Sequence, residues 1–494
     1  MAEFTNPTIY GMTFGRTPIY TAETTIDRSN VVDVLRKAVS VFEKNAAETK
    51  ALYEYYKGNQ PILYRIKEQR PEINNTIVMN RAYEIVTFKT GRFLYKDIQY
   101  INCNENENTN EVNKLNKFFY AEGKAGKDRV LTDWLHICGN GYRMLIDAKV
   151  SEGTPFHTYT LDPQRTFVVY ADTVDQKPMM GAYYTRQNVT DATGSTTTQK
   201  VWTVYTKSEV FTIINYEVTD VKQHILGDVP IIEYQANYAR LGAFEVVRGL
   251  LDAINLAESN RLDGIEQFIQ ALMVFKNLDV PEEQIQMLKQ VGAICIPGES
   301  DIEYLVHELN QSQAQTLVDD LYQAVLTICG MPNRNGGTST SDNKGAVVLR
   351  DGWSAAATAV KETRQYFEAS ERRMLKMALK CFNTYMNGVD KGGNYDLQLA
   401  DVDVHFDEGE YENALERAQV LTMLLSNDWV HPREAYKISN ITADPESSYM
   451  QGKAFHEEQK KEEQEELDRA IAQEVAEAKK ASNDAPGEEM TDDV

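Results

Sequence analysis

Three long helical segments, separated by two interruptions of different kinds, are predicted within residues 241–387. The first segment, 241–272, carries apolar residues at the 3.6-residue spacing of an amphipathic helix and would be about 48 Å long. A compact insert over 273–308, with short strands and a short helix, follows it, and a second helix is predicted over 309–330. Long helices around a polar loop favour a mechanical component over a catalytic centre.

The second interruption is a polar, glycine-rich loop over 331–345. A third helix of roughly ten turns is predicted to begin near Ala346. Apolar residues recur in it every seven positions, at Trp353, Val360, Phe367, Met374 and Cys381. This seam can pack against a neighbouring helix of the same chain or of another subunit. We favour an ordinary core face, which is the commoner use of such a stripe.

The chain before residue 241 divides into three parts. Residues 1–28 are rich in Thr, Pro, Gly and Tyr and predict an extended arm. Helices are predicted over 29–57, 79–91 and 111–138. Short β-prone runs separated by turn residues then fill 141–234 and predict an antiparallel β region.

The C-terminal part is predicted as one strand over 396–406, helices over 411–426 and 432–438, and a charged helix-prone tail. Residues 457–494 hold 14 acidic and 5 basic side chains, and a disordered end is expected from Ser482. The fold class predicted for the whole chain is therefore α+β and mostly helical.

Composition narrows the functional classes. With 42% hydrophobic residues the chain can bury large cores, and its net charge of −23 argues against tight binding of nucleic acid through phosphate neutralisation. We expect no signal peptide and no membrane-spanning segment. The cysteines are odd in number and never form a CxxC pair, which favours free thiols in a reducing compartment; they are Cys103, Cys138, Cys295, Cys329 and Cys381.

Catalytic signatures are missing from the sequence. It contains no GxxxxGK[ST] loop, no GxGxxG after a strand, no HExxH and no GxSxG. Gly336-Gly-Thr-Ser-Thr-Ser341 superficially resembles a phosphate cradle but lacks the Lys-Ser/Thr pair, and no apolar strand precedes it. We therefore expect a protein that is not an enzyme and that needs no cofactor.

One polar group permits a metal-binding interpretation. Asp401, Asp403, His405 and Asp407 alternate with apolar residues, so on a strand they would share one face and could hold a divalent cation. The same alternation is typical of a half-buried strand with its polar side in water, which we favour. A metal-dependent nuclease built on these residues remains an alternative function. A scaffold that forms no ring and binds partners through its acidic tail is another.

The chain resembles the portal (head-to-tail connector) proteins of tailed double-stranded DNA bacteriophages, in their siphophage form. The resemblance covers roughly residues 30–455 and rests on the order of several motifs together with the order of helix, insert, helix, polar loop and helix. The motifs are Tyr55-Tyr-Lys-Gly-Asn-Gln-Pro-Ile62, Asn74-Asn-Thr-Ile77, Asn80-Arg-Ala-Tyr-Glu-Ile-Val86, Gly91-Arg-Phe-Leu-Tyr95, Gly139-Asn-Gly-Tyr142, Leu161-Asp-Pro-Gln-Arg-Thr-Phe-Val-Val-Tyr170 and Gly227-Asp-Val-Pro-Ile-Ile-Glu-Tyr234.

This resemblance implies a portal-type subunit with long stem helices, a small α/β clip insert, a β-rich wing and a helical crown. About twelve subunits would close into a ring at one capsid vertex. The implied parts are the arm 1–28, wing 29–240, stem helix 241–272, clip 273–308, stem helix 309–330, tunnel loop 331–345, long wing helix and closing strand 346–405, crown 406–481 and acidic tail 482–494.

The resemblance also implies function and partners. Double-stranded DNA would pass through the ring during packaging and ejection, and the terminase large subunit and later a head-completion or adaptor protein would dock on it. Scaffolding and major capsid proteins would be further partners, no membrane would be involved, and a protein made in the host cytoplasm would end in the virion. The tunnel-loop residues would be Asn333, Arg334, Asn335, Gly336, Gly337 and Lys344, and the clip contacts Lys276, Asn277, Pro297, Glu299 and Tyr304. Ordinary loop solubility explains the loop cations equally well.

Overall fold

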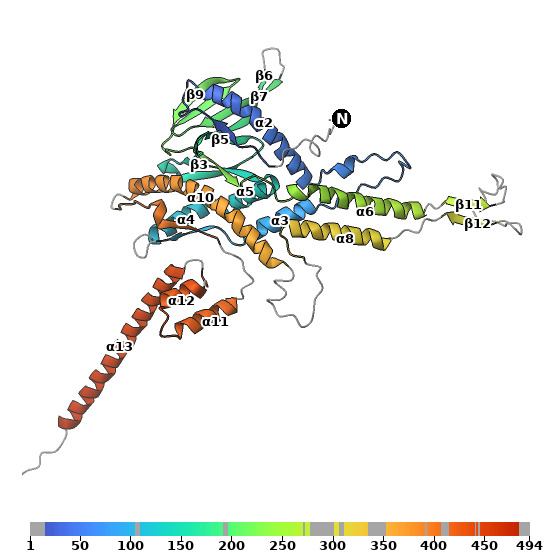
Figure 1. Ribbon diagram of the computed structural model, residues 1–494. Coiled ribbons are helices and arrows are strands. Elements are labelled where there is room, and N and C mark those ends of the chain that lie inside the picture. The colour runs from blue at the N-terminus through green and yellow to red at the C-terminus, as the bar shows by residue number, and fades with distance from the viewer. Residues whose placement is uncertain are drawn as a thin grey trace, which may run out of the picture. The chain divides into compact units, whose positions relative to one another are not determined.

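The computed structural model describes residues 15–103, 109–190, 196–269, 272–276, 301–305, 311–333, 352–390, 393–406, 414–439, 441–442 and 445–483. The chain divides into two compact units. The larger unit comprises Met1–Ile98 and Lys114–Leu399, and the smaller unit comprises Gln99–Asn113 and Ala400–Val494. The architecture is α+β and mostly helical, so the predicted fold class is confirmed (Figure 1).

A six-stranded sheet forms one part of the larger unit. In spatial order its strands are β1 (Ile19–Thr21), β5 (Thr166–Ala171), β6 (Pro178–Thr190), β7 (Thr196–Tyr205), β8 (Glu209–Ile214) and β9 (Glu217–Gln223). All neighbours are antiparallel except β1, which runs parallel to β5. The described part of the predicted arm thus contributes an edge strand.

Helix α2 (Val31–Tyr56) covers this sheet with its apolar stripe. The Phe42 ring lies 4.8 Å from that of Phe167 on β5 and 6.0 Å from that of Trp202 on β7, measured between centroids. Aromatic pairs at such distances stabilise a core beyond their buried area. The predicted helix over 29–57 and the β character of the region are both present.

A second sheet of three strands carries β3 (Asn140–Asp147) between β10 (Ile231–Gln235) and β4 (Phe156–Leu161). The β-prone runs predicted over 142–146, 166–170, 179–185, 200–206 and 209–215 correspond to β3, β5, β6, β7 and β8, whereas β1, β4, β9 and β10 were not predicted. Charged and polar residues interrupt the apolar alternation in β4 and β9, so periodicity alone does not show them.

The predicted single helix over 111–138 is wrong, because two helices occupy that region. Helix α4 (Thr109–Ala121) ends before Gly123, and α5 (Lys124–Cys138) begins after it. Gly123 has a φ of 64°, a left-handed conformation that glycine adopts without strain and that interrupts a helix. Helix α3 (Arg81–Phe93) lies close to its predicted place and packs on α5.

Helix α6 (Arg248–Ile269) begins seven residues later than predicted. Gly242 passes so close to α5 that an added Cβ would lie 2.3 Å from the Ile137 carbonyl oxygen. Its N–H donates to the Glu245 carboxylate at 2.9 Å, and residues Glu245–Val247 form the 3₁₀ turn η3 before the α-helix starts. Tertiary contact therefore sets this helix boundary.

The hairpin β11 (Leu272–Lys276) and β12 (Asp301–Leu305) follows α6, so Leu272 lies in a strand and not in the predicted helix. Helix α8 (Gln311–Ile328) returns beside α6 (Figure 1). Ile265 of α6 and Leu317 and Ile328 of α8 lie at the helical spacing from which an apolar stripe is predicted, but the structure leaves all three exposed.

Helix α10 (Trp353–Val389) begins later than the predicted Ala346. Its seven-residue seam packs within the chain: Phe367, Met374 and Cys381 are buried, and the Trp353 ring lies 6.1 Å from Phe88. The interpretation as an ordinary core face is therefore the correct one for these positions.

A buried charge network ties α10 to the three-stranded sheet. Glu371 of α10 accepts hydrogen bonds from Arg143 Nη1 at 3.0 Å and from the Tyr234 hydroxyl at 2.6 Å. Lys124 Nζ lies 2.8 Å from the other Glu371 oxygen, and Asp128 pairs with both Lys124 and Arg143. Two cations and two carboxylates thus pair with each other. Charged side chains can be buried only when opposite charges neutralise them in this way.

The smaller unit pairs β2 (Gln99–Asn102) with β13 (Val402–His405) and contains α11 (Ala414–Leu425), α12 (Pro432–Ser439) and the long α13 (Pro445–Asn483). The strand predicted over 396–406 is shorter, since Leu399–Asp401 forms the 3₁₀ turn η4. No helix in the described part of the chain is long and apolar enough to cross a membrane. Within the described residues, Cys103, Cys138, Cys329 and Cys381 are free thiols.

Candidate functional site

Helices α6 and α8 form an antiparallel pair with an apolar seam. Leu251 and Ile254 of α6 and Val325 of α8 are buried in one hydrophobic cluster. Burying a side chain of this size contributes about 1.5–3 kcal/mol. Farther along the pair, Arg261 Nη1 donates to Gln315 Oε1 at 2.6 Å. The pair is therefore held along the length that the structure describes.

A second contact braces α6 from outside the pair. Residues 75–79 run extended along it, and their backbone N–H groups bond to side chains spaced four residues apart on the helix. Asn75 N–H donates to Asp263 Oδ1 at 2.8 Å, Ile77 N–H to Ser259 Oγ at 2.9 Å and Met79 N–H to Asn255 Oδ1 at 2.8 Å. The spacings match because two residues of extended chain and four residues of helix both advance about 6 Å.

Asp263 carries the charge of this brace. Arg65 Nη2 and Lys67 Nζ lie 3.2 Å and 3.0 Å from its Oδ2. Burial alone would raise the pKa of this carboxyl, but the Asn75 backbone N–H and the Lys67 ammonium outweigh it, so the pKa is lowered. Asp263 is therefore ionised at neutral pH and binds two cations from the preceding loop to the helix.

The hairpin that follows α6 places two of the predicted clip residues. Lys276 is opposite Asp301, and Tyr304 is opposite Met273, in the antiparallel register of β11 and β12. The structure thus brings Lys276 and Tyr304 to one hairpin. Asn277, Pro297 and Glu299 lie outside the described residues.

The two ends of the predicted tunnel loop meet. Helix α8 stops in a Schellman-type turn, in which the Met331 N–H bonds to the Leu326 carbonyl at 2.8 Å and Gly330 has a φ of 61°. A Cβ added to Gly352, at the start of α10, would lie 3.9 Å from the Met331 carbonyl oxygen. The end of α8 and the start of α10 are therefore neighbours in space, so the predicted loop begins and ends at the same place. Asn333 is described, whereas Arg334, Asn335, Gly336, Gly337 and Lys344 lie outside the described residues.

Basic side chains stand next to this junction. The Arg92 guanidinium lies 5.9 Å from the centre of the Trp353 ring, which begins α10. Burial lowers the pKa of Lys89, which lines a small cavity with Gly330 and Val360. The loop therefore emerges from a site that α3, α8 and α10 fix together.

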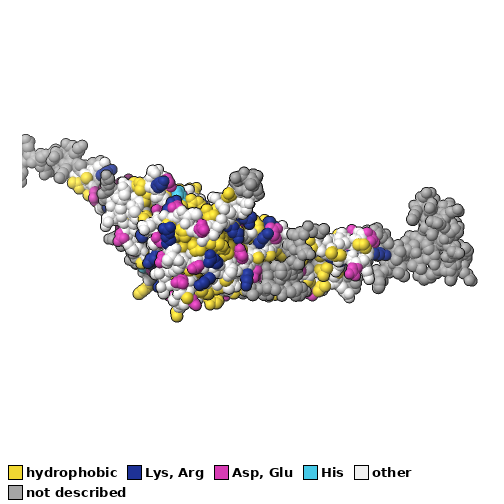
Figure 2. Space-filling model, turned by 90° about the horizontal axis from the view of Figure 1, so that it is seen from above, with side chains coloured by type: hydrophobic (Ala, Val, Ile, Leu, Met, Phe, Trp, Pro, Cys, Tyr) yellow, Lys and Arg dark blue, Asp and Glu magenta, His cyan; other side chains and the backbone are white. Residues whose placement is uncertain are grey.

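The helix pair itself is acidic. Helices α6 and α8 together contain six carboxylates but only two basic residues, Arg248 and Arg261. Among these carboxylates Asp319 and Asp320 are exposed, whereas Asp263 is buried. Figure 2 shows acidic and basic side chains interspersed over the face that it draws. The six carboxylates are Asp252, Glu258, Asp263, Glu266, Asp319 and Asp320.

The candidate metal residues are not arranged as one face of a strand. Asp401 belongs to the turn η4, Asp403 and His405 lie on β13, and Asp407 is outside the described residues. Val402 and Val404 between them are buried, as in any half-buried strand. Within the part of the chain that the structure describes, no three His, Cys, Asp or Glu side chains are close enough to hold a metal ion.

Sequence reasoning missed the brace on α6 and the network at Glu371. The sequence does show one sign of the brace: polar residues recur at every fourth position of the predicted helix, at Asn255, Ser259 and Asp263. That pattern is typical of a solvated face, and only the packed fold shows that these side chains are buried and bonded to another segment.

The chain belongs to the family of phage portal proteins of the SPP1 Gp6-like type, because the model of that family matches residues 37–477. It is therefore a head-to-tail connector of a phage and a virion component. A solved structure described as "Neck of empty GTA particle computed with C6 symmetry" is similar at a TM-score of 0.40 and 14% identity, over 80% of this chain and 94% of that one. No curated protein sequence matches the chain.

Proposed function

We propose that this portal protein forms a ring of about twelve subunits at one capsid vertex, through which double-stranded DNA is packaged and later ejected. The observation that carries the proposal is the match of the portal family to residues 37–477. The α6–α8 pair is consistent with a channel wall, because Asp319 and Asp320 are exposed on it, whereas Asp263 is buried and paired with Arg65 and Lys67. A DNA duplex bears a charge about every 1.7 Å, so a basic channel would hold it, whereas an acidic one repels it weakly and lets it move.

Within this proposal each part has a role. The α6–α8 pair is the stem that lines the channel, and residues 331–345 are the tunnel loop around the DNA. The insert 273–308, with Lys276 and Tyr304 on its described hairpin, is the clip that docks the terminase large subunit and later a head-completion protein. Residues 29–240 and 346–405 are the wing, 406–481 are the crown, and scaffolding and major capsid proteins are further partners.

Assembly is tested on the purified full-length chain by light scattering and negative-stain electron microscopy. We expect particles of about twelve subunits with a central hole. A mass that stays monomeric at all concentrations, or particles without a hole, would refute the ring and leave a non-ring scaffold as the better interpretation.

We further propose that the chain does no chemistry on DNA or nucleotides. The missing phosphate-binding loop supports this, and ATP turnover by the purified protein should equal background. ATP turnover abolished by a point substitution in this chain would contradict it. Metal-dependent DNA cleavage lost on Asp403→Asn would instead favour the nuclease alternative.

A further inference from the structure

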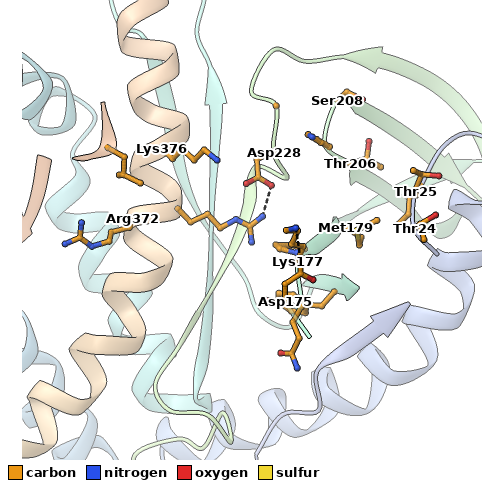
Figure 3. A pocket seen from close by; sticks show the side chains of 18 residues that line it. Thr24, Thr25, Asp175, Lys177, Met179, Thr206, Ser208, Asp228, Arg372 and Lys376 are labelled. Atoms are coloured by element: carbon orange, nitrogen blue, oxygen red, sulfur yellow. Dashed lines mark hydrogen bonds and ion pairs between the residues drawn. The ribbon is translucent and has the colours of Figure 1, made fainter. Parts of the chain in front are cut away.

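A groove of about 960 Å³ lies in the larger unit, away from the α6–α8 pair. Figure 3 shows α10 along one side of it and the hydroxyl side chains of Thr24, Thr25, Thr206 and Ser208 along the other. The β5–β6 turn with Lys177 lies between them. No role assigned above uses this groove.

Cations dominate its lining although the chain is strongly acidic. Lys376 points from α10 toward the groove, whereas Arg372 on the same helix points away and pairs with Glu368 (Figure 3). Lys207 lines the opposite wall. Among the described residues, no carboxylate pairs with Lys207 or with Lys376, and both side chains are exposed.

Two more cations are held in place by carboxylates of the groove itself. Lys177 Nζ lies 2.6 Å from Asp175, and Arg373 Nη2 lies 2.8 Å from Asp228. Lys380, one turn beyond Lys376, approaches Gly227, since a Cβ added there would lie 3.0 Å from its ammonium. The lining is thus positive overall but contains fixed negative charge.

Apolar groups form part of the same lining. Ile26, Met179 and Leu399 contribute to it, and the Tyr170 ring stands beside them. Met179 and Leu399 are half-buried, so these two side chains offer a surface on which another apolar side chain can pack.

We propose that this groove binds an acidic peptide segment of a partner protein, with carboxylates spaced around an apolar side chain. Lys207 and Lys376 would pair with the carboxylates, and the apolar residue would cover Met179 and Leu399. The exposed hydroxyls of Thr24, Thr25 and Ser208 would bond to the peptide backbone, whereas the Thr206 hydroxyl already bonds to Glu209. A nucleic-acid backbone fits less well, because it is uniformly anionic and would meet Asp175 and Asp228 without using the apolar lining.

The test uses the assembled full-length protein and a fluorescein-labelled synthetic peptide, Glu-Glu-Leu-Glu-Asp-Leu-Glu-Glu, with binding followed by fluorescence polarisation. We expect saturable binding that weakens at least about tenfold in Lys207→Glu with Lys376→Glu, a loss of about 1.4 kcal/mol. Lys37→Glu with Lys44→Glu, two exposed lysines of α2 outside the groove, is the matched control and should bind like the wild type. A peptide with Gln and Asn in place of Glu and Asp should not bind.

Four results would overturn the proposal. Absence of peptide binding is the simplest. Tighter binding of a short DNA duplex with the same loss in the double variant would assign the groove to nucleic acid. Binding only by a chain truncated after Ala481 would make this chain's own acidic tail the occupant. Binding by monomers but not by assembled protein would mean that a neighbouring copy covers the groove.

Discussion

The backbone N–H of Asn75 donates a 2.8 Å hydrogen bond to Oδ1 of Asp263, 188 residues farther along the chain. The second oxygen of the same carboxylate holds Arg65 and Lys67. One buried side chain on the distal half of α6 thus fixes a loop that precedes the β region. In the proposed stem, this contact would keep the helix pair stiff where only two helices support each other.

Asp263→Ala should loosen this brace. It removes the acceptor for the Asn75 N–H and the partner of two cations, and hydrogen bonds to charged groups contribute about 1.5–3 kcal/mol. We expect residues 75–79 to lose protection from amide hydrogen exchange, measured by mass spectrometry, while the six-stranded sheet keeps its protection.

Two variants on the same helix control for this result. Asp263→Asn keeps one acceptor oxygen and should show a smaller loss. Glu266→Gln removes a carboxylate three residues away that has no partner in the described structure and should show none. Equal loss of protection in Glu266→Gln would mean that the brace is not specific to Asp263.

Acid should destabilise the larger unit through His136. Burial, together with the charge of Lys89, lowers the pKa of this histidine from 6.5 to about 3. Only the unfolded chain binds a proton between these two values, so stability falls as pH drops below 6.5. Between pH 7 and pH 5 the loss from this one residue is about 2 kcal/mol.

The measurement is the melting temperature between pH 7 and pH 5. His136→Asn places a non-titrating amide near Thr90, which the Nδ1 atom contacts at 3.1 Å, and should flatten the pH dependence even if the variant is less stable overall. His456→Gln, on the exposed face of α13, should keep the wild-type slope. The same slope in His136→Asn and the wild type would rule out this residue as the cause.

Truncation after Ala481 should have little effect on assembly. It removes the last two residues of α13 and the acidic residues beyond it, and the described side chains over 456–473 are all exposed. Residues 482–494 have no apolar periodicity and contain Pro486 and Gly487, so we expect them to be dispensable for folding. Ring formation by light scattering and the melting temperature should stay nearly unchanged, and a large drop would show that the tail is packed.

Much of the fold followed from periodicity, because α2, α3, α8 and α12 are amphipathic over most of their length. The errors have local physical causes. Gly123 breaks one helix by its positive φ, and the contact of Gly242 with the Ile137 carbonyl delays the start of α6. Neither event leaves a signal in the hydrophobic pattern, since a glycine within a helical run is compatible with both outcomes.

The candidate site was less accessible to sequence reasoning. The pattern located the helix pair, but it gave no sign that Glu371 and Arg143 are buried. They are buried because each neutralises the other and because Lys124 and Asp128 complete the set. Arg143 and Glu371 lie 228 positions apart in the sequence, so the residues next to either one give no sign that the two form a pair.

The sharpest prediction concerns the two cations of the proposed tunnel loop. Gly330 and Gly352 bring the ends of the loop together at a fixed junction of α8 and α10, so substitutions inside the loop should not disturb the packing of the wing. Arg334→Ala with Lys344→Ala removes the charges that would touch DNA phosphates transiently without holding them. The double variant should still form rings and enter heads.

Packaged DNA length or packaging rate should nevertheless fall in an in-vitro packaging assay, run beside electron microscopy of the same variant. Lys37→Ala with Lys44→Ala, two exposed lysines of α2, removes the same charge elsewhere and should package normally. Normal packaging by the loop variant would refute a role for these two charges. Failure to form rings would instead make the loop a structural interface, because charges that act only on passing DNA cannot be required for assembly in its absence.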